Sequence, residues 1–499
     1  MTGKNVLATV TLMALLCGFS QAQETTYYSS DSSIVGKGGM VNNKKEGRWV
    51  LYHKESSLTE SGTYENDLRE GIWRVFDTDN TVIIETNYRK GIISGKFITY
   101  YPNGKVMVSG ILQDTVKDKT WKEYNKSGLI LSEGSYDMGR RTGRWKLYVE
   151  DSGILKSDIE YLNDSLHGEY KEYDQYGALA MQGNYNHGAK TGKWESFDIY
   201  GNVVLSDEYE RGVLNGQSFE YYTGGLKKSE KSYSMGQPAG IWTYYHENGE
   251  VQSKWNFENG LPEGEYIEYH ANGNLSVTGK YILGKKIGLW KNYYESGSLF
   301  GAGPYLDDAK YGNWKYFNES GHLISEGKFM EGLEEGQWVF YFPGDKIQTI
   351  GSYKDGKQTG LWGHFHPDGT LMQEETWDNG LLIDLSDVFF GTDTLTGGSL
   401  ENGNGQRINY REDKSVKEKV EFKNGLPEGS WVYYENGNIS FSGSMKAGKK
   451  DGLWTYYYSN EQIESQGNYK DDEQSGKWLY YNRRGSVIRE INYDDAAKQ

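Results

Sequence analysis

The 499-residue sequence contains a single cysteine, Cys17, which lies in its first 22 residues. If that segment is removed, the remaining chain has no thiol, which excludes disulfides and thiolate metal sites from it. Hydrophobic residues make up only 36% of the sequence, and this low share argues against one deep core. Beyond the N-terminal segment, no apolar run approaches the length of a membrane span, so we expect no transmembrane segment.

Positive charge is also in short supply. Lys and Arg number 54 against 70 Asp and Glu, which gives a formal net charge of −16. Loss of Lys4 with the N-terminal segment makes this −17 (−16 − 1). Such a surface repels phosphate backbones, so nucleic acid is not an expected partner. It attracts a basic partner instead.

The first 22 residues have the pattern of a secretory signal. Lys4 is followed by the apolar stretch Val6 to Leu16, and Ser20-Gln21-Ala22 supplies small residues where a signal peptidase reads them. We therefore expect an exported protein, periplasmic or extracellular, that is cleaved after Ala22. Lipid attachment at Cys17 fits less well, because a bulky residue precedes it.

What the sequence has in abundance is a repeat of 24 residues. The pattern Gly-x-Trp-x-x-Tyr, here called the frame, first occurs at Gly47–Tyr52 and last at Gly476–Tyr481. Its 18 copies are separated by 17 intervals, of which 14 are 24 residues long, and Lys119 alone replaces the leading Gly. A fixed period of this length indicates a repeat array.

Each repeat is predicted to contain two short antiparallel strands. Pairs such as Asn103-Gly104 and Asn248-Gly249 separate runs rich in aromatic and β-branched residues, and they suit tight hairpin turns. Frequent glycine disfavours helix. The expected fold class is all-β: an elongated single-sheet solenoid (meander) of about 19 two-stranded antiparallel β-hairpin repeats with a 24-residue period.

Aromatic residues are predicted to be the core of this sheet. A single layer has no second layer to bury against, so its rings must pack on those of neighbouring repeats. The third and sixth frame positions face opposite sides of a straight strand, which gives ladders on both faces unless a bulge after the Gly re-aims one of them. The alternative is that the rings are exposed for a ligand. The structural ladder comprises Trp49, Trp73, Trp121, Trp145, Trp194, Trp242, Trp290, Trp314, Trp338, Trp362, Trp431, Trp454 and Trp478.

The period also predicts the boundaries. After the signal peptide at 1–22, residues 23–46 form a degenerate N-terminal capping repeat, and fourteen repeats occupy 47–383. The frame expected at 384 is missing, so 384–404 is either a degenerate repeat or a hinge. Four repeats and a short polar tail make up 405–499.

No catalytic constellation or phosphate-binding loop stands out, so no catalytic residue, cofactor or metal site is assigned and we expect no enzyme. His246, His270 and His366 share the seventh frame position, but equivalent residues of neighbouring repeats are about 9.5 Å apart, too far to share a zinc ion. His364 and His366, with Asp368, lie closer together, although such residues on an exposed strand are usually solvated.

The stretches Gly240–Gly249 and Gly429–Gly437 resemble the MORN repeat (membrane occupation and recognition nexus), and more closely the bacterial variant found in YwqK-family antitoxins. The resemblance covers residues 23 to 493. It implies an elongated β-hairpin sheet that serves as a scaffold for protein or lipid contact, and in the YwqK type a protein that neutralises a toxin.

Three functions follow as expectations. The first is an exported, non-enzymatic scaffold that binds a protein partner along its length. The second is a cell-wall or glycan-binding solenoid whose exposed aromatic rings stack on sugars. The third is a YwqK-type antitoxin or immunity protein. A long, flat, acidic surface favours the first.

Overall fold

The computed structural model describes residues 23–494. Its elements are all β-strands, and the described residues contain no helix, which confirms the all-β prediction. None of them therefore forms a helix long and apolar enough to cross a membrane. The predicted signal peptide at 1–22 and the chain end at 495–499 lie outside the described residues. The chain divides into two compact units, Met1–Gln237 and Pro238–Gln499.

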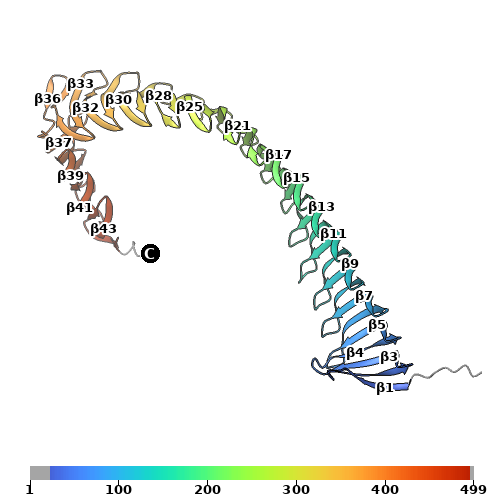
Figure 1. The fold of residues 1–499 in the computed structure, drawn as a ribbon. Coiled ribbons are helices and arrows are strands. Elements are labelled where there is room, and N and C mark those ends of the chain that lie inside the picture. Colours follow the sequence, from blue (N-terminus) through green and yellow to red (C-terminus); the bar gives the residue numbers. More distant parts are fainter. Residues whose placement is uncertain (1–22, 495–499) are drawn as a thin grey trace, which may run out of the picture. The chain divides into compact units, whose positions relative to one another are not determined.

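The first unit is a meander in which each strand pairs with the next one along the chain (Figure 1). The pairings are antiparallel from β1–β2 to β17–β18. The strands are β1 (Gln23–Tyr28), β2 (Ile34–Val41), β3 (Lys44–His53), β4 (Thr59–Glu65), β5 (Leu68–Phe76), β6 (Val82–Arg89), β7 (Ile92–Tyr100), β8 (Val106–Gln113), β9 (Val116–Tyr124), β10 (Ile130–Asp137), β11 (Arg140–Tyr148), β12 (Leu155–Leu162), β13 (Ser165–Tyr173), β14 (Leu179–Asn186), β15 (Ala189–Phe197), β16 (Val203–Glu210), β17 (Val213–Tyr221) and β18 (Lys227–Ser234); the two-residue β19 (Gln237–Pro238) contains the boundary.

The second unit has a meander, a hairpin and an eight-stranded sheet. The meander consists of β20 (Gly240–Tyr245), β21 (Val251–Glu258), β22 (Leu261–Pro262), β23 (Gly264–Tyr269), β24 (Leu275–Ile282), β25 (Lys285–Tyr293), β26 (Leu299–Leu306), β27 (Ala309–Lys310), β28 (Gly312–Phe317), β29 (Leu323–Met330), β30 (Leu333–Tyr341), β31 (Ile347–Lys354), β32 (Lys357–Phe365), β33 (Leu371–Asp378) and β34 (Leu381–Leu385). The hairpin is β35 (Val388–Phe390) with β36 (Asp393–Leu395). The eight-stranded sheet contains β37 (Gly405–Tyr410), β38 (Val416–Lys423), β39 (Leu426–Glu435), β40 (Asn438–Lys446), β41 (Lys449–Tyr457), β42 (Ile463–Lys470), β43 (Glu473–Tyr481) and β44 (Val487–Asn492).

The leading Gly of the frame forms a β-bulge. At Gly288, φ is +64°, and the pairing of β24 with β25 shifts register between Thr278 and Lys280, opposite this glycine. All 17 frame glycines (18 copies minus Lys119) have positive φ, and Lys119 itself adopts +57°. A residue with a Cβ is strained in this region, which explains why glycine leads the frame.

One face of the sheet carries the aromatic core. Trp290 meets Tyr281 edge to face at a ring distance of 5.3 Å, and it meets Tyr305 in the same way at 5.7 Å. The same alternation of a frame Trp with an aromatic residue of the neighbouring strand recurs in both units. Edge-to-face pairs add to the apolar burial, so this ladder supplies the core that a single layer otherwise lacks.

The sixth-position aromatic residues lie on the opposite face, as alternation along a strand dictates. Two of them form hydrogen bonds with carboxylates: the Tyr148 hydroxyl donates to Glu133 at 2.8 Å, and the Tyr341 hydroxyl donates to Glu326 at 2.7 Å. Burial, followed by the hydrogen bond to the carboxylate, raises the pKa of both tyrosines to about 12. Aromatic residues therefore occupy both faces, but they serve in a ring-on-ring ladder on one and in polar pairs on the other.

Candidate functional site

Most of the predicted ladder is closed to solvent. Trp242 and Trp431 are half-buried, while the other members expose no more than 7% of their surface. The buried members are Trp49, Trp73, Trp121, Trp145, Trp194, Trp290, Trp314, Trp338, Trp362, Trp454 and Trp478. An aromatic ring that binds a ligand must be accessible, so these eleven indoles belong to the core.

A glycine on the neighbouring strand decides which indoles are buried. Eleven residues before each buried Trp stands a Gly, here called the glycine seat, and a Cβ added there would overlap the indole. Gly303 under Trp314 is an example. The two half-buried indoles, Trp242 and Trp431, have Lys231 and Val420 at this place in the sequence. The glycine seat thus lets the indole lie flat on the backbone.

A hydrogen bond fixes the orientation of the seated indole. Ten of the eleven donate from Nε1 to the carbonyl of the residue ten positions earlier, at 2.9–3.2 Å. Trp290 is the exception, because its buried Nε1 has no acceptor among the described residues. The bond satisfies an indole donor that burial would otherwise leave unpaired.

Basic side chains cover the ladder from outside. Four residues before the Trp, a Lys or Arg places its charge over the rings: Lys286 Nζ lies 4.4 Å from the Trp290 ring, and Lys310 Nζ lies 4.5 Å from the Trp314 ring. This position is here called the cation position. The residues that fill it over a ring are Lys45, Arg69, Lys117, Arg141, Lys190, Lys286, Lys310 and Lys450.

The seventh-position histidines hold neighbouring repeats together. Nε2 of His246, His270 and His366 lies 2.9, 2.9 and 2.6 Å from a backbone carbonyl oxygen 23 residues later. His364 instead contacts Thr349 and Glu375, so it does not share a ligand set with His366. No group of three side chains able to hold a metal occurs among the described residues.

An ion cluster forms where the frame is lost. Glu375 is buried, and its Oε1 lies 2.5 Å from Arg407 Nη2, while its Oε2 lies 3.3 Å from His364 Nε2 and accepts from Trp377 Nε1 at 2.9 Å. Burial alone raises the pKa of Glu375, but the His364 hydrogen bond and the Arg407 charge outweigh it and lower this pKa to about 2. Both carboxylate oxygens are engaged, so the cluster ties β33 to β37.

Residues 384–404 lie in the chain between the two strands that this cluster joins. They contain the β35–β36 hairpin, and Gly403 N–H donates to Ile383 O at 2.7 Å. Leu382, which is fully buried, donates its N–H to Gly425 O at 3.1 Å. The segment interrupts the sheet while keeping backbone and side-chain contacts on both sides of the break.

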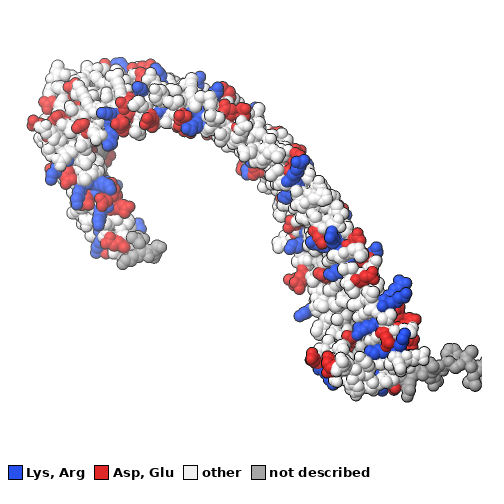
Figure 2. Space-filling view, in the orientation of Figure 1, with Lys and Arg blue, Asp and Glu red and all other residues white. Residues whose placement is uncertain are grey.

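The edge at which one repeat turns into the next exposes aliphatic side chains. In the first unit these residues, here called the apolar edge row, come from five successive turns: Leu68, Ile92, Val116, Met138 and Leu162. The second unit has its own exposed set at this edge: Leu261, Leu283, Leu306, Met330 and Leu333. On the face drawn in Figure 2, Lys and Arg are interspersed with Asp and Glu along the chain, so neither sign forms a separate block.

The opposite edge is mostly polar but carries two exposed rings. Its turns are built on Asp, Asn and Ser side chains, as where Asp198 Oδ1 accepts from Tyr200 N–H at 2.9 Å. Tyr176 and Tyr200 occupy equivalent places in neighbouring turns and expose 78% and 77% of their surface. They are the two most exposed aromatic rings of the first unit within the described residues, and a stacking ligand can reach both.

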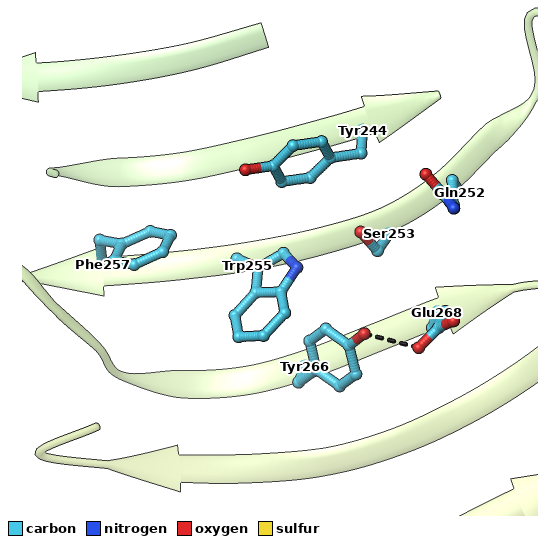
Figure 3. A pocket seen from close by; sticks show the side chains of 7 residues that line it. All are labelled: Tyr244, Gln252, Ser253, Trp255, Phe257, Tyr266 and Glu268. Atoms are coloured by element: carbon cyan, nitrogen blue, oxygen red, sulfur yellow. Dashed lines mark hydrogen bonds between the residues drawn. The ribbon is translucent and has the colours of Figure 1, made fainter. Parts of the chain in front are cut away.

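An aromatic pocket lies in the second unit, in the repeats of β20, β21 and β23 (Figure 3). It has a volume of 420 Å³ and is lined by Tyr244, Gln252, Ser253, Trp255, Phe257, Tyr266 and Glu268. Trp255 stands at a glycine-seat position, so Tyr266, the frame residue opposite, meets a ring (4.5 Å between centroids) instead of backbone. Glu268 is the one charged residue of the lining.

The pocket was not predicted from the sequence, although a signal was present. Trp255 is one of two tryptophans outside the third frame position, and it replaces the glycine that recurs there. The prediction of the ladder used the aromatic positions alone. The glycine that recurs eleven residues before each buried Trp would have marked Trp255 as an exception.

Comparisons with known proteins identify the repeat. The family model of the MORN repeat variant matches residues 93–111, 239–259, 262–282, 286–307, 310–330, 334–355 and 450–471. No curated protein matches the chain. The chain is therefore a MORN repeat protein, with matching repeats in both units.

Solved structures add little to this. The crystal structure of TcdB2-TccC3 is 12% identical with a TM-score of 0.13, and the match covers 95% of this chain and 32% of that one. The Photorhabdus luminescens Tc holotoxin pore is 12% identical with a TM-score of 0.11, covering 95% and 31%. This chain spans about a third of the length of those chains. A likeness this weak indicates neither a shared fold nor a shared function. The repeat variant is the identity that the comparisons give: this is a MORN repeat protein.

Proposed function

We propose that this MORN repeat protein is an exported, non-enzymatic scaffold that binds another protein along the edge at which one repeat turns into the next. The observation that carries the proposal is the apolar edge row, with one exposed aliphatic side chain in each of five successive turns. Equivalent turns are about 9.5 Å apart, so the row extends over roughly 40 Å. Exposed apolar side chains that gather along one edge offer a partner protein apolar surface to bury.

Aliphatic side chains suit a protein partner better than a sugar. A row of Leu, Ile, Val and Met gains from burial against apolar surface but offers no ring for stacking. Repeated weak contacts along an array also add up, because the second contact is intramolecular once the first has formed. A toxin-neutralising role is one case of this function, and the identity of the partner decides it.

The test is site-specific crosslinking followed by binding with purified components. A photoreactive residue at Ile92 should capture one defined protein from the envelope fraction. Leu68→Gln, Ile92→Thr and Val116→Thr combined should then weaken binding of that purified protein by about a hundredfold, since each exposed aliphatic contact contributes roughly 1 kcal/mol. Capture of polysaccharide at Ile92, or unchanged affinity of the triple variant, would refute the proposal.

The matched control lies on the opposite edge. Tyr176→Ser with Tyr200→Ser should leave protein binding unchanged. The same double variant tests the second candidate function, glycan binding, which the high exposure of these two rings supports. Loss of binding to a purified polysaccharide in this variant, with full binding retained in the triple variant, would favour the glycan function.

Export has its own test. Cell fractionation should place the protein outside the cytoplasm, and N-terminal sequencing of the mature form should begin at Gln23. A cytoplasmic protein that retains Met1 would refute export without affecting the edge proposal.

A further inference from the structure

In much of the ladder, the outer side of the aromatic rings is covered by a basic side chain of the same chain. In eight repeats the chain places its own Lys or Arg over the rings, as Lys286 does over Trp290 and Tyr305 (4.4 and 5.3 Å). A cation over a ring face is attracted by the ring quadrupole, and the attraction grows when the site is shielded from water. In these eight repeats, the aromatic face therefore holds a cation that the chain itself supplies.

The two repeats that line the pocket have no basic residue at the cation position. Their cation positions are Pro238 and Pro262, neither of which carries a charge. Within residues 23–494, no Lys or Arg lies over the rings of Trp255, Phe257 or Tyr266. These rings are packed on one another, with Trp255 at 4.5 Å from Tyr266 and 6.3 Å from Phe257.

A carboxylate stands beside the rings. Glu268 Oε2 accepts from the Tyr266 hydroxyl at 2.6 Å (Figure 3). Its Oε1 has no hydrogen-bond or ion-pair partner among the described residues. At the same place in a later repeat, the Tyr316 hydroxyl accepts from Lys310 at 2.7 Å, so a polar group here meets a basic side chain. Burial and the bond to Glu268 both raise the pKa of Tyr266, which keeps its hydroxyl a donor to the carboxylate.

We infer that this pocket takes a Lys or Arg side chain of the protein partner, whose charge lies against the half-buried Trp255 and pairs with Glu268 Oε1, while the buried Tyr266 holds Glu268 in place through its hydroxyl. The inference rests on the proposed scaffold function and names the chemistry that its partner must present. Charge complementarity supports it, because Glu268 is the one charged lining residue and the chain as a whole is acidic. A neutral sugar would satisfy the rings but leave the carboxylate without a counter-charge.

The chain offers a matched variant for the central ring. In the first unit, Tyr170 donates to Glu172 at 3.1 Å, which is the same Tyr–Glu pair, but the residue opposite Tyr170 is the buried Ile159. Trp255→Ile therefore copies a combination that the fold already uses. Glu268→Gln removes the charge, and Pro262→Lys restores the cation that other repeats carry.

The test titrates the full chain with Nα-acetyl-arginine amide, using the neutral isostere Nα-acetyl-citrulline amide as control. Saturation-transfer NMR reports binding of either probe, and 5-fluorotryptophan labelling reports which indole responds. We expect a saturable shift at Trp255 with the arginine probe and about tenfold weaker binding of the citrulline probe. Glu268→Gln should weaken arginine binding by about tenfold, whereas Trp255→Ile and Pro262→Lys should abolish it. Glu172→Gln removes one charge from the equivalent pair and should have no effect.

Equal binding of the two probes, equal shifts at Trp255 and Trp314, or a response to a methyl glucoside but not to arginine would overturn the inference. The small probe needs no partner, so this result is independent of the scaffold test. Loss of partner binding in the edge variant with probe binding intact supports both proposals, while a silent pocket on a chain that still binds its partner removes the pocket alone.

Discussion

Residues 240–282 and 286–330 belong to one unit and share the frame, yet their aromatic faces differ. In the later stretch, Gly303 lies under Trp314, and Lys310 covers the ring from outside. In the earlier stretch, Trp255 occupies the glycine-seat position and Pro262 the cation position. In the first arrangement Trp314 is almost fully buried, whereas in the second Trp255 stays half-buried and lines a 420 Å³ pocket.

The comparison teaches that two positions outside the frame determine how the aromatic face of a repeat is packed and covered. The frame positions its strand and bulge in both stretches. The glycine seat then determines whether the ring can lie on the backbone, and the cation position determines whether the chain itself occupies the outer side. A repeat array can thus open a pocket while it keeps the frame.

The largest expected effect separates two tryptophans of the eight-stranded sheet. Trp454 is fully buried over Gly443, whereas Trp431 pairs with Val420 and is half-buried. Trp454→Ala should lower the local free energy of unfolding by about 3–5 kcal/mol, and Trp431→Ala by less than about half of that. Hydrogen exchange of β41 and β39 measures both values. Equal losses would contradict the role of the glycine seat.

Acid should weaken the ion cluster that connects β33 and β37 across residues 384–404, a connection here called the joint. The folded-state pKa of Glu375, about 2, lies below the ordinary 4.5, so its stabilisation is present above pH 4.5 and is lost as pH falls through 2. The free energy at stake is on the order of 3 kcal/mol. Urea unfolding between pH 5 and pH 2 should show this loss in the native chain and less of it in Glu375→Gln. The same pH dependence in both proteins would show that the ion cluster does not stabilise the joint.

A methyl group under an indole should cost more than one beside a movable ring. A Cβ at Gly303 would overlap Trp314, whereas one at Gly363 would meet Phe365 Cε2 at 3.2 Å. Gly303→Ala should destabilise the chain by about 1–3 kcal/mol through overpacking. Gly363→Ala should stay within about 1 kcal/mol of the native protein, because its φ is negative and its neighbours are side chains. Urea midpoints of both variants test the difference, and a larger loss at Gly363 would reverse it.

The smallest effect on stability is expected at the pocket. Trp255→Ile replaces a half-buried ring with the residue type that faces Tyr170, so the free energy of unfolding should change by less than about 1.5 kcal/mol. Exchange of β21 and β23 measures it. A loss as large as that of Trp454→Ala would make Trp255 a core residue and remove the basis for a binding pocket.

The sequence predicts the regular part of this fold well. A 24-residue period with Gly and Asn-Gly turns predicts hairpins. A bulge after the leading Gly was only one of two alternatives, and the positive φ of the frame glycines in the structure decides for it. Lys119 shows that the backbone position is kept even when glycine is not.

Contacts between distant residues were not predictable in the same way. Glu375 and Arg407 pair across a segment with no frame, so no period relates them. The pocket depends on which face Trp255 presents, and the bulge register determines that face. The cation position was readable as a recurrent Lys or Arg, but its meaning emerges only when Lys286 and Lys310 are seen over the rings.

Hydroxyl-radical footprinting read by mass spectrometry tests the central claim most directly, because one experiment reports the oxidation rate of each tryptophan. The account predicts slow oxidation of the eleven indoles with a glycine seat and fast oxidation of Trp242, Trp255 and Trp431. Similar rates throughout, or Trp314 reacting as fast as Trp255, would contradict it.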